Sequence, residues 1–305
     1  MKVLFLTAPL KERIWGGDYF KKIHRTENEN IGELWSASAH KEGESIIVGG
    51  EFNGIKLSEV YTSHPELFNN PTLKEFPILV KLIYAKDPLS VQVHPNDEYA
   101  LKYENQYGKT EGWLVLDAAE GSTLVLGHNA KNKDELVKYI ENDNYDELLK
   151  TVPVKPGQFY PIYAGTIHAI GAGLTILEIQ QSSDVTYRFY DYHRKDANGN
   201  ERQLHVEQAV AVTTYNECEL EQSNHLVQPS HVMWDNEYFT VGMLNLNGEE
   251  TFVEPTNYAI ITVATGEFEL DGKKLTVGDS FILTKLANNV TISGNGVLVR
   301  TDAKW

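Results

Sequence analysis

A segment near the middle of the chain combines glycines at its bends with a histidine at its end. It starts at Gly157, passes through the mostly apolar residues 159–163, turns at Gly165 and ends at His168. Apolar and aromatic runs punctuated by glycine favour extended strands joined by tight turns. The segment therefore predicts a β-rich fold that holds an imidazole at the end of an extended stretch.

A second group of chemically active side chains lies upstream of this segment. Gln92 and His94 stand two apart on a predicted strand, so their side chains point to the same face. Glu111 opens another extended run, residues 113–116. Together with His168, these residues supply two imidazoles and one carboxylate, the ligand count of a catalytic zinc site with one position left open. We predict that His94, Glu111 and His168 bind a metal ion.

The acidic composition limits the possible partners. The 43 acidic and 27 basic residues give a net charge of -16, which repels nucleic acid and anionic membranes at long range. A bound divalent ion and a few local basic side chains can reverse this sign inside one cleft, so a small anionic substrate stays compatible. We expect no nucleic acid, no membrane and no obligate protein partner.

Two features indicate a cytoplasmic protein. The single cysteine, Cys218, cannot form an internal disulfide, so the chain does not need an oxidising compartment. The apolar run at residues 1–10 is too short for a signal peptide or a membrane span.

The length and the strand pattern predict two units. A chain of 305 residues with 41% hydrophobic content is too long for one small domain and can bury a sizeable core. We expect residues 1–218 to hold the metal site and short helices, and residues 219–305 to form a small β-barrel. Strands are predicted at residues 3–6, 31–38, 45–48, 76–85, 238–246, 258–264, 267–270, 280–283 and 297–300. Helices are predicted at residues 97–107, 132–150 with a break at 141–144, and 203–212.

The spacing of the histidine segment resembles a motif of the cupin superfamily. Gly157 is followed at +8 by Gly165 and at +11 by His168, as in the second cupin motif, and residues 92–111 resemble a stretched first motif. This resemblance implies a mainly β fold of two cupin-like jelly-roll barrels, with a few short helices inserted in and around the first. At the same offsets from Gly278 the second unit has no histidine, so a second barrel is expected to lack the metal.

Within the cupins, three runs in the same order resemble the type I mannose-6-phosphate isomerases in their short bacterial form. These runs are residues 92–97, 164–170 and 183–188, and the similarity spans nearly the whole chain from residues 13–17 onward. The resemblance implies a metal-dependent aldose-ketose isomerase that interconverts mannose 6-phosphate and fructose 6-phosphate through an enediolate. It also implies one zinc ion per chain as the cofactor.

The resemblance suggests roles for individual residues. Gln92 is either a fourth metal ligand or a hydrogen-bonding partner of the substrate. Arg188, four residues after Asp184, matches the arginine that would stabilise the enediolate, or it pairs with Asp184 or Glu178. Lys109 matches an active-site lysine whose pKa a nearby cation would lower, as suits a proton carrier, although a plain surface lysine is the alternative. Glu178 and Asp184 are alternative acid or base groups.

Two other functions remain open from the sequence. A metal-retaining cupin that binds sugar without turnover would act as a sensor, although such a protein does not need a positioned proton carrier. An iron-dependent cupin oxygenase is a further alternative, because two histidines and one carboxylate also satisfy the iron facial triad. Arg13, beside Trp15, either contacts the substrate or packs on the aromatic ring.

Overall fold

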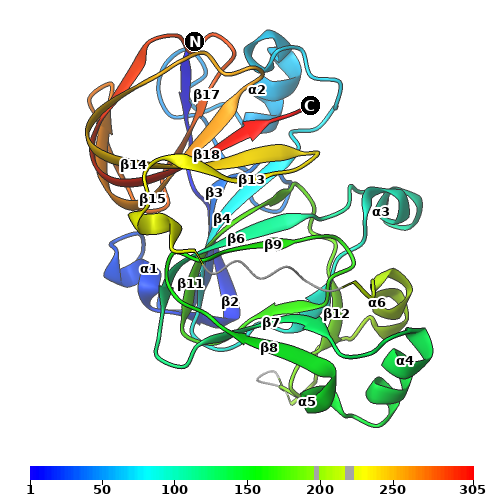
Figure 1. Cartoon of the computed structure of the whole chain (residues 1–305). Coiled ribbons are helices and arrows are strands. Elements are labelled where there is room, and N and C mark those ends of the chain that lie inside the picture. The colour runs from blue at the N-terminus through cyan, green and yellow to red at the C-terminus, as the bar shows by residue number, and fades with distance from the viewer. Residues whose placement is uncertain (196–198, 217–222) are drawn as a thin grey trace.

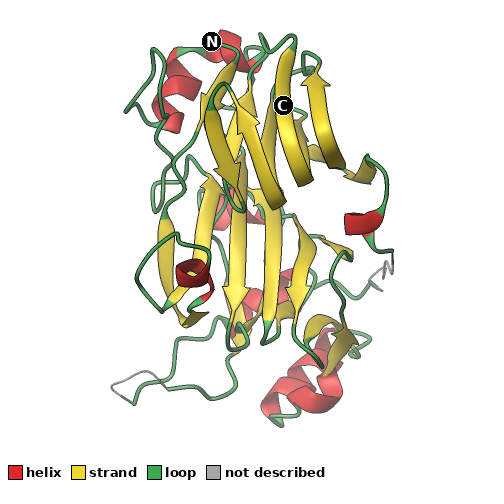
Figure 2. Cartoon of the chain, turned by 90° about the vertical axis from the view of Figure 1, so that its left-hand side faces the viewer, coloured by secondary structure: helices red, strands yellow, loops and turns green. Residues whose placement is uncertain are grey.

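The computed structural model describes residues 1–195, 199–216 and 223–305, so Cys218 and the predicted boundary after it lie outside the described residues. The fold is mainly β, as predicted, with three antiparallel sheets stacked along the molecule and helices at its periphery (Figures 1 and 2). The described part of the chain contains no helix long and apolar enough to cross a membrane.

The six-stranded sheet lies in the middle of the molecule (Figure 1). Its strands, in spatial order, are β2 (Leu10–Gly17), β3 (Ile31–Ala37), β4 (Ile78–Ala85), β11 (Leu174–Gln181), β6 (Glu111–Ala118) and β9 (Phe159–Ile162). One core joins this sheet to the seven-stranded sheet through residues such as Val80, Leu177 and Phe239. A second core joins it to the five-stranded sheet through Ile83, Ile176 and Leu126. Burial on both faces explains why β4 is almost continuously apolar.

The five-stranded sheet covers one face of the central sheet. Its order is β12 (Tyr187–Tyr190), β5 (Val91–Val93), β10 (His168–Ile170), β7 (Thr123–His128) and β8 (Leu149–Pro153). Three helices flank it in Figure 1, namely α4 (Lys133–Glu141), α5 (Tyr145–Leu148) and α6 (Val206–Val212). The predicted break inside residues 132–150 is confirmed, and the Asn132 side chain begins α4 by accepting a hydrogen bond from the backbone of Glu135 at 3.0 Å.

The seven-stranded sheet contains both the start and the end of the described chain. Its order is β1 (Val3–Phe5), β17 (Ser280–Leu283), β15 (Ala259–Leu270), β18 (Val290–Ala303), β14 (Phe239–Phe252) and β13 (His231–Asp235), with β16 (Lys273–Thr276) paired to β15. This sheet therefore combines strands from both sides of the boundary that the sequence predicts, and that boundary stays a prediction. The other helices of the described residues are α1 (Tyr19–Lys22), α2 (Leu57–Ser63), α3 (Asp97–Tyr103) and two 3₁₀ turns, η1 (Pro65–Phe68) and η2 (His225–Val227).

Two local predictions were wrong. Residues 45–48 form only isolated bridges, Leu6 to Ile47 and Ile46 to Lys56, instead of a strand. The two strands predicted on either side of Gly266 are one strand, β15. Gly266 lies opposite Gly296 on β18, and a Cβ at Gly266 would meet the Asn295 oxygen at 2.0 Å. This glycine marks a close approach of two backbones, although in sequence it looks like a turn.

Candidate metal centre and catalytic cavity

The three predicted metal ligands meet between the central and five-stranded sheets. His94 follows β5, Glu111 begins β6 and His168 begins β10. The ligand atoms lie within 4.8 Å of one another, and all three side chains are buried. The Glu111 carboxylate lies between the rings, with Oε2 3.6 Å from His94 Nε2 and Oε1 3.4 Å from His168 Nε2.

Backbone carbonyls orient both imidazoles. His94 Nδ1 lies 2.9 Å from the Val185 oxygen, and His168 Nδ1 lies 2.8 Å from the Thr166 oxygen. Each ring therefore donates from Nδ1 and directs the lone pair of Nε2 toward Glu111, which is the tautomer of a metal-binding histidine. Burial lowers the pKa of His168 to about 4 and also lowers the pKa of His94 well below its ordinary value. Both rings are thus held neutral, as metal ligands must be.

The carboxylate of Glu111 is buried without hydrogen-bond donors. Neither of its oxygens accepts a hydrogen bond from the described residues, and the Lys109 ammonium, 3.0 Å from Oε2, supplies charge without a well-directed hydrogen bond. Burial, and then the charge of Glu178, raises the pKa of Glu111. Lys109 contacts only Oε2, so Oε1 of this buried carboxylate has neither a cation nor a hydrogen-bond donor among the described residues, which is costly. A divalent ion between the three side chains meets this need, so the residues present fit a metal.

Gln92 lies directly beside this cluster. It faces His168 across the ladder between β5 and β10, and its Nε2 is 3.4 Å from His168 Nε2. An amide turned by 180° brings its oxygen to the same point. Gln92 can therefore serve as a donor to His168 or as an oxygen ligand of a metal.

A cavity of about 420 Å³ opens in front of the cluster. The structure brings Gln92 and all four predicted catalytic residues together in its wall, whereas the three predicted metal ligands are buried deeper. The lining residues are Arg13, Trp15, Glu33, Lys81, Ile83, Leu89, Ser90, Gln92, Lys109, Glu178, Asp184, Thr186, Arg188 and Arg202.

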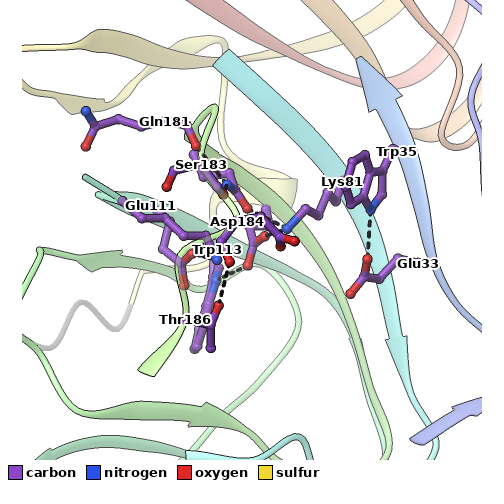
Figure 3. Close-up of polar contacts among 12 residues, drawn as sticks. Glu33, Trp35, Lys81, Glu111, Trp113, Gln181, Ser183, Asp184 and Thr186 are labelled. Atoms are coloured by element: carbon purple, nitrogen blue, oxygen red, sulfur yellow. Dashed lines mark hydrogen bonds and ion pairs between the residues drawn. The ribbon is translucent and has the colours of Figure 1, made fainter. Parts of the chain in front are cut away.

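Lys81 is a cavity residue that the sequence analysis missed. It lies on β4, buried beside Trp35 (Figure 3), and its Nζ contacts Glu178 Oε1 at 3.0 Å and Gln180 Oε1 at 2.6 Å. The indole of Trp113 donates to the other oxygen of Glu178 at 2.9 Å. Burial opposes the charge of Glu178, but Lys81 and then Lys109 outweigh it and lower its pKa. A lone lysine within an apolar strand was the signal that could have indicated this pair.

Lys109 is buried between carboxylates. Burial disfavours its charge, but Glu111 and Glu178 outweigh this effect and raise its pKa. Its Nζ also lies 3.2 Å from His94 Nε2, so Lys109 is not a plain surface residue. The lowered pKa that the sequence analysis expects concerns the site with a bound cation, and it remains a prediction.

The two remaining predicted residues differ in their surroundings. Arg188 is half-buried and donates from Nη1 to the Gln203 oxygen at 2.8 Å. Within the described ranges it forms no ion pair with Asp184 or Glu178, which were its alternative partners. Asp184 is exposed to the cavity. Arg13 lines the cavity as a bidentate partner of Glu33, at 3.0 and 2.8 Å.

The jelly-roll-like sheets and the buried cluster of two histidines and one glutamate define a cupin with a candidate metal centre. The family model of phosphomannose isomerase type I, catalytic domain, matches residues 3–112, and that of the mannose-6-phosphate isomerase cupin domain matches residues 230–302. A mannose-6-phosphate isomerase of Streptococcus mutans is 38% identical over 301 residues, 96% of this chain and 95% of the relative. The chain belongs to the type I mannose-6-phosphate isomerase family of aldose-ketose isomerases.

Solved structures agree with this assignment. The crystal structure of the mannose 6-phosphate isomerase from Bacillus subtilis matches with a TM-score of 0.89 and 34% identity, over 99% of each chain. A more distant mannose 6-phosphate isomerase, bound with zinc and yttrium, shares the fold with a TM-score of 0.77 and 18% identity, over 100% of each chain.

Proposed function

We propose that this protein interconverts mannose 6-phosphate and fructose 6-phosphate by moving a proton between C1 and C2 through an enediolate. The proposal rests on one observation: the buried cluster of His94, Glu111 and His168 lies behind a cavity whose wall is lined by charged side chains. A sugar-binding sensor needs the cavity but does not need Lys109 and Arg188 placed beside the cluster. Family membership favours the isomerase over an iron-dependent oxygenase.

We assign one zinc ion per chain to the cluster, with Gln92 as the candidate fourth ligand. The ligand set supports zinc, and the related protein bound with zinc and yttrium has the same fold. When bound, zinc supplies Lewis-acid stabilisation of substrate oxygens. The other partner is a small sugar phosphate, and the single cysteine in the sequence suits the cytoplasm.

We assign the other two catalytic tasks, charge stabilisation and proton transfer, to different side chains of the cavity. Arg188 and Lys109 carry positive charge toward the oxygens that become negative in the enediolate. Glu178 is a weak base, because Lys81 and Trp113 occupy its two oxygens and its pKa is lowered. We therefore assign proton transfer to Asp184, the carboxylate exposed to the cavity.

The decisive experiment follows fructose 6-phosphate in heavy water with chelator-treated and zinc-reconstituted protein. We expect zinc-dependent product, label at C1 or C2, and loss of both zinc and activity in His168→Ala. His64→Ala is the matched control, because His64 is partly exposed and contacts Glu66 and the ring of Phe52, not the metal cluster. Sugar phosphate that binds but is not converted with any metal would leave the sensor as the function.

A further inference from the structure

The basic residues that line the cavity differ in how completely carboxylates neutralise them. Two of them have a carboxylate of their own within 3.0 Å, namely Arg13 with Glu33 and Lys81 with Glu178, and Lys109 lies 3.0 Å from Glu111 at the metal cluster. Among the described residues Arg188 has no carboxylate partner, and Arg202 shares one with a second arginine. Away from the metal cluster, uncompensated positive charge is therefore concentrated at the Arg188 and Arg202 end of the cavity.

Arg202 is held in place by a buried carboxylate. Its Nε donates to Asp191 Oδ2 at 2.7 Å, and its Nη2 bonds to Oδ1 of the same group. The Asp191 side chain is only 5% exposed, whereas that of Arg202 is 26% exposed and lines the cavity. Arg194 bonds to Asp191 Oδ1 as well, so that one negative charge serves two guanidinium groups. Nη1 of Arg202 is not used by Asp191.

Residues 203–205, which follow Arg202, are hydrogen-bonded to Arg188 on β12. The backbone N–H of Arg188 donates to His205 Nδ1 at 3.2 Å, and the backbone N–H of His205 donates to the Arg188 oxygen at 2.8 Å. The Arg188 side chain holds the Gln203 oxygen. Gln92 on β5 is the partner of Arg188 at one edge of β12. The segment that carries Arg202 therefore lies along the opposite edge of β12, farther from Gln92 than Arg188 is.

The substrate of the proposed reaction carries its reacting carbons and its phosphate at opposite ends. If C1 and C2 lie against the metal cluster and Gln92, the phosphate lies toward the far end of the cavity. A phosphate dianion approaching a chain of net charge -16 needs a local site with excess positive charge. A guanidinium is suited to such a group because its planar fork donates two parallel hydrogen bonds.

We propose that Arg202 binds the phosphate group of the substrate and that Asp191 is the positioning residue that aims Arg202 into the cavity. This inference rests on the proposed function and names the subsite that the function requires. The lowered pKa of Arg188, caused first by burial and then by the charge of Arg202, agrees with two cations held close together at this end.

Kinetics of Arg202→Gln test the proposal. We expect KM for mannose 6-phosphate to rise at least about tenfold with kcat within about threefold of wild type, because the lost contact is a charge-assisted hydrogen bond made equally in ground and transition states. The inhibition constant of inorganic phosphate rises in parallel. Asp191→Asn shifts KM in the same direction, and Asp191→Glu recovers part of the loss.

A matched control distinguishes phosphate binding by Arg202 from a purely structural role of this residue. Arg25 forms a similar pair with Asp279 at 2.7 Å outside the cavity, and Arg25→Gln is expected to change stability without changing KM. An unchanged KM in a folded Arg202→Gln protein overturns the inference. If wild type fails to convert mannose 6-phosphate, the proposed function fails, and titration with inorganic phosphate decides the subsite: weaker binding by Arg202→Gln supports it, and equal or absent binding overturns it.

Discussion

Gln92 and His168 face each other across the ladder between β5 and β10, with their Nε2 atoms 3.4 Å apart. Arg188 faces Gln92 from the other side, on β12. The five-stranded sheet thus presents one row of functional side chains, Arg188, Gln92 and His168. Opposite this row, the ring of Trp113 on the central sheet lies 5.3 Å from that of His168. The register of the five-stranded sheet therefore determines which side chains meet in the candidate site. The central sheet contributes one metal ligand, Glu111 on β6.

Because His168 and Gln92 lie side by side in this row, we expect their substitutions to weaken zinc binding to different degrees. His168→Ala removes a buried ligand and is expected to abolish stoichiometric zinc binding. Gln92→Leu removes a neighbour with weaker donor atoms and is expected to lower zinc affinity by about 10- to 100-fold. Metal analysis after dialysis and competition with a chromogenic chelator measure both effects. Equal zinc affinity in Gln92→Leu and wild type would show that Gln92 only contacts substrate.

Gly165 predicts a link between backbone conformation and the metal centre. It has a φ of +88°, and its N–H donates to the His94 oxygen at 2.8 Å. A Cβ at this position would lie 2.5 Å from Thr214 Cγ2 and 2.9 Å from the Val212 oxygen. Gly165→Ala is therefore expected to lower the free energy of unfolding by more than about 1 kcal/mol and to weaken zinc binding.

Gly121→Ala is the control for Gly165. Gly121 has a similar φ of +81°, but a Cβ there meets nothing within 4 Å. Urea unfolding and zinc titration of both variants separate backbone strain from steric clash. Zinc affinity that falls equally in both would contradict the proposed link, since only Gly165 touches His94.

The metal ligands could be predicted from sequence because their signals are local. Gly157, Gly165 and His168 lie within one short segment, and the alternation of Gln92 and His94 specifies a common face. The pair of Lys81 and Glu178 could not be predicted in the same way. Its members are 97 residues apart, and only the register between β4 and β11 makes them neighbours.

Arg202 was missed for a related reason. Nothing in the surrounding sequence marks it, and its position depends on Asp191 and on a segment that lies along β12. The turns around Gly266 were misread because a glycine needed for close strand pairing has the same sequence signal as a glycine in a turn. In both cases tertiary packing supplies information that local pattern lacks.

Glu178 predicts a pH dependence of stability. Its pKa is lowered in the folded protein, so its contribution is fully present above the unfolded value of about 4.3 and is lost as the pH falls through the lower folded value. Glu178→Gln leaves Lys81 buried without its carboxylate and is expected to cost about 3 to 5 kcal/mol at neutral pH. The difference from wild type shrinks as the pH falls below about 4.

Urea unfolding of metal-free protein at several pH values measures this difference. The metal-free form is needed because zinc release in acid would change stability by itself. Glu207→Gln is the control, since Glu207 is exposed on α6. A stability difference between wild type and Glu178→Gln that stays constant from pH 7 to acid would contradict a charged Glu178.

Substitution of Arg188 is expected to lower kcat, whereas substitution of Arg202 is expected to raise KM. Because Arg188 lies beside Gln92 and has no carboxylate partner among the described residues, its charge is available to the enediolate. Arg188→Gln is expected to lower kcat by about 10²- to 10³-fold while zinc content stays unchanged. Arg188→Lys restores little, because an ammonium cannot reproduce two parallel donors. A variant that keeps kcat and raises only KM would move Arg188 from the reacting carbons to the phosphate, and the assignment of the two arginines would have to be revised.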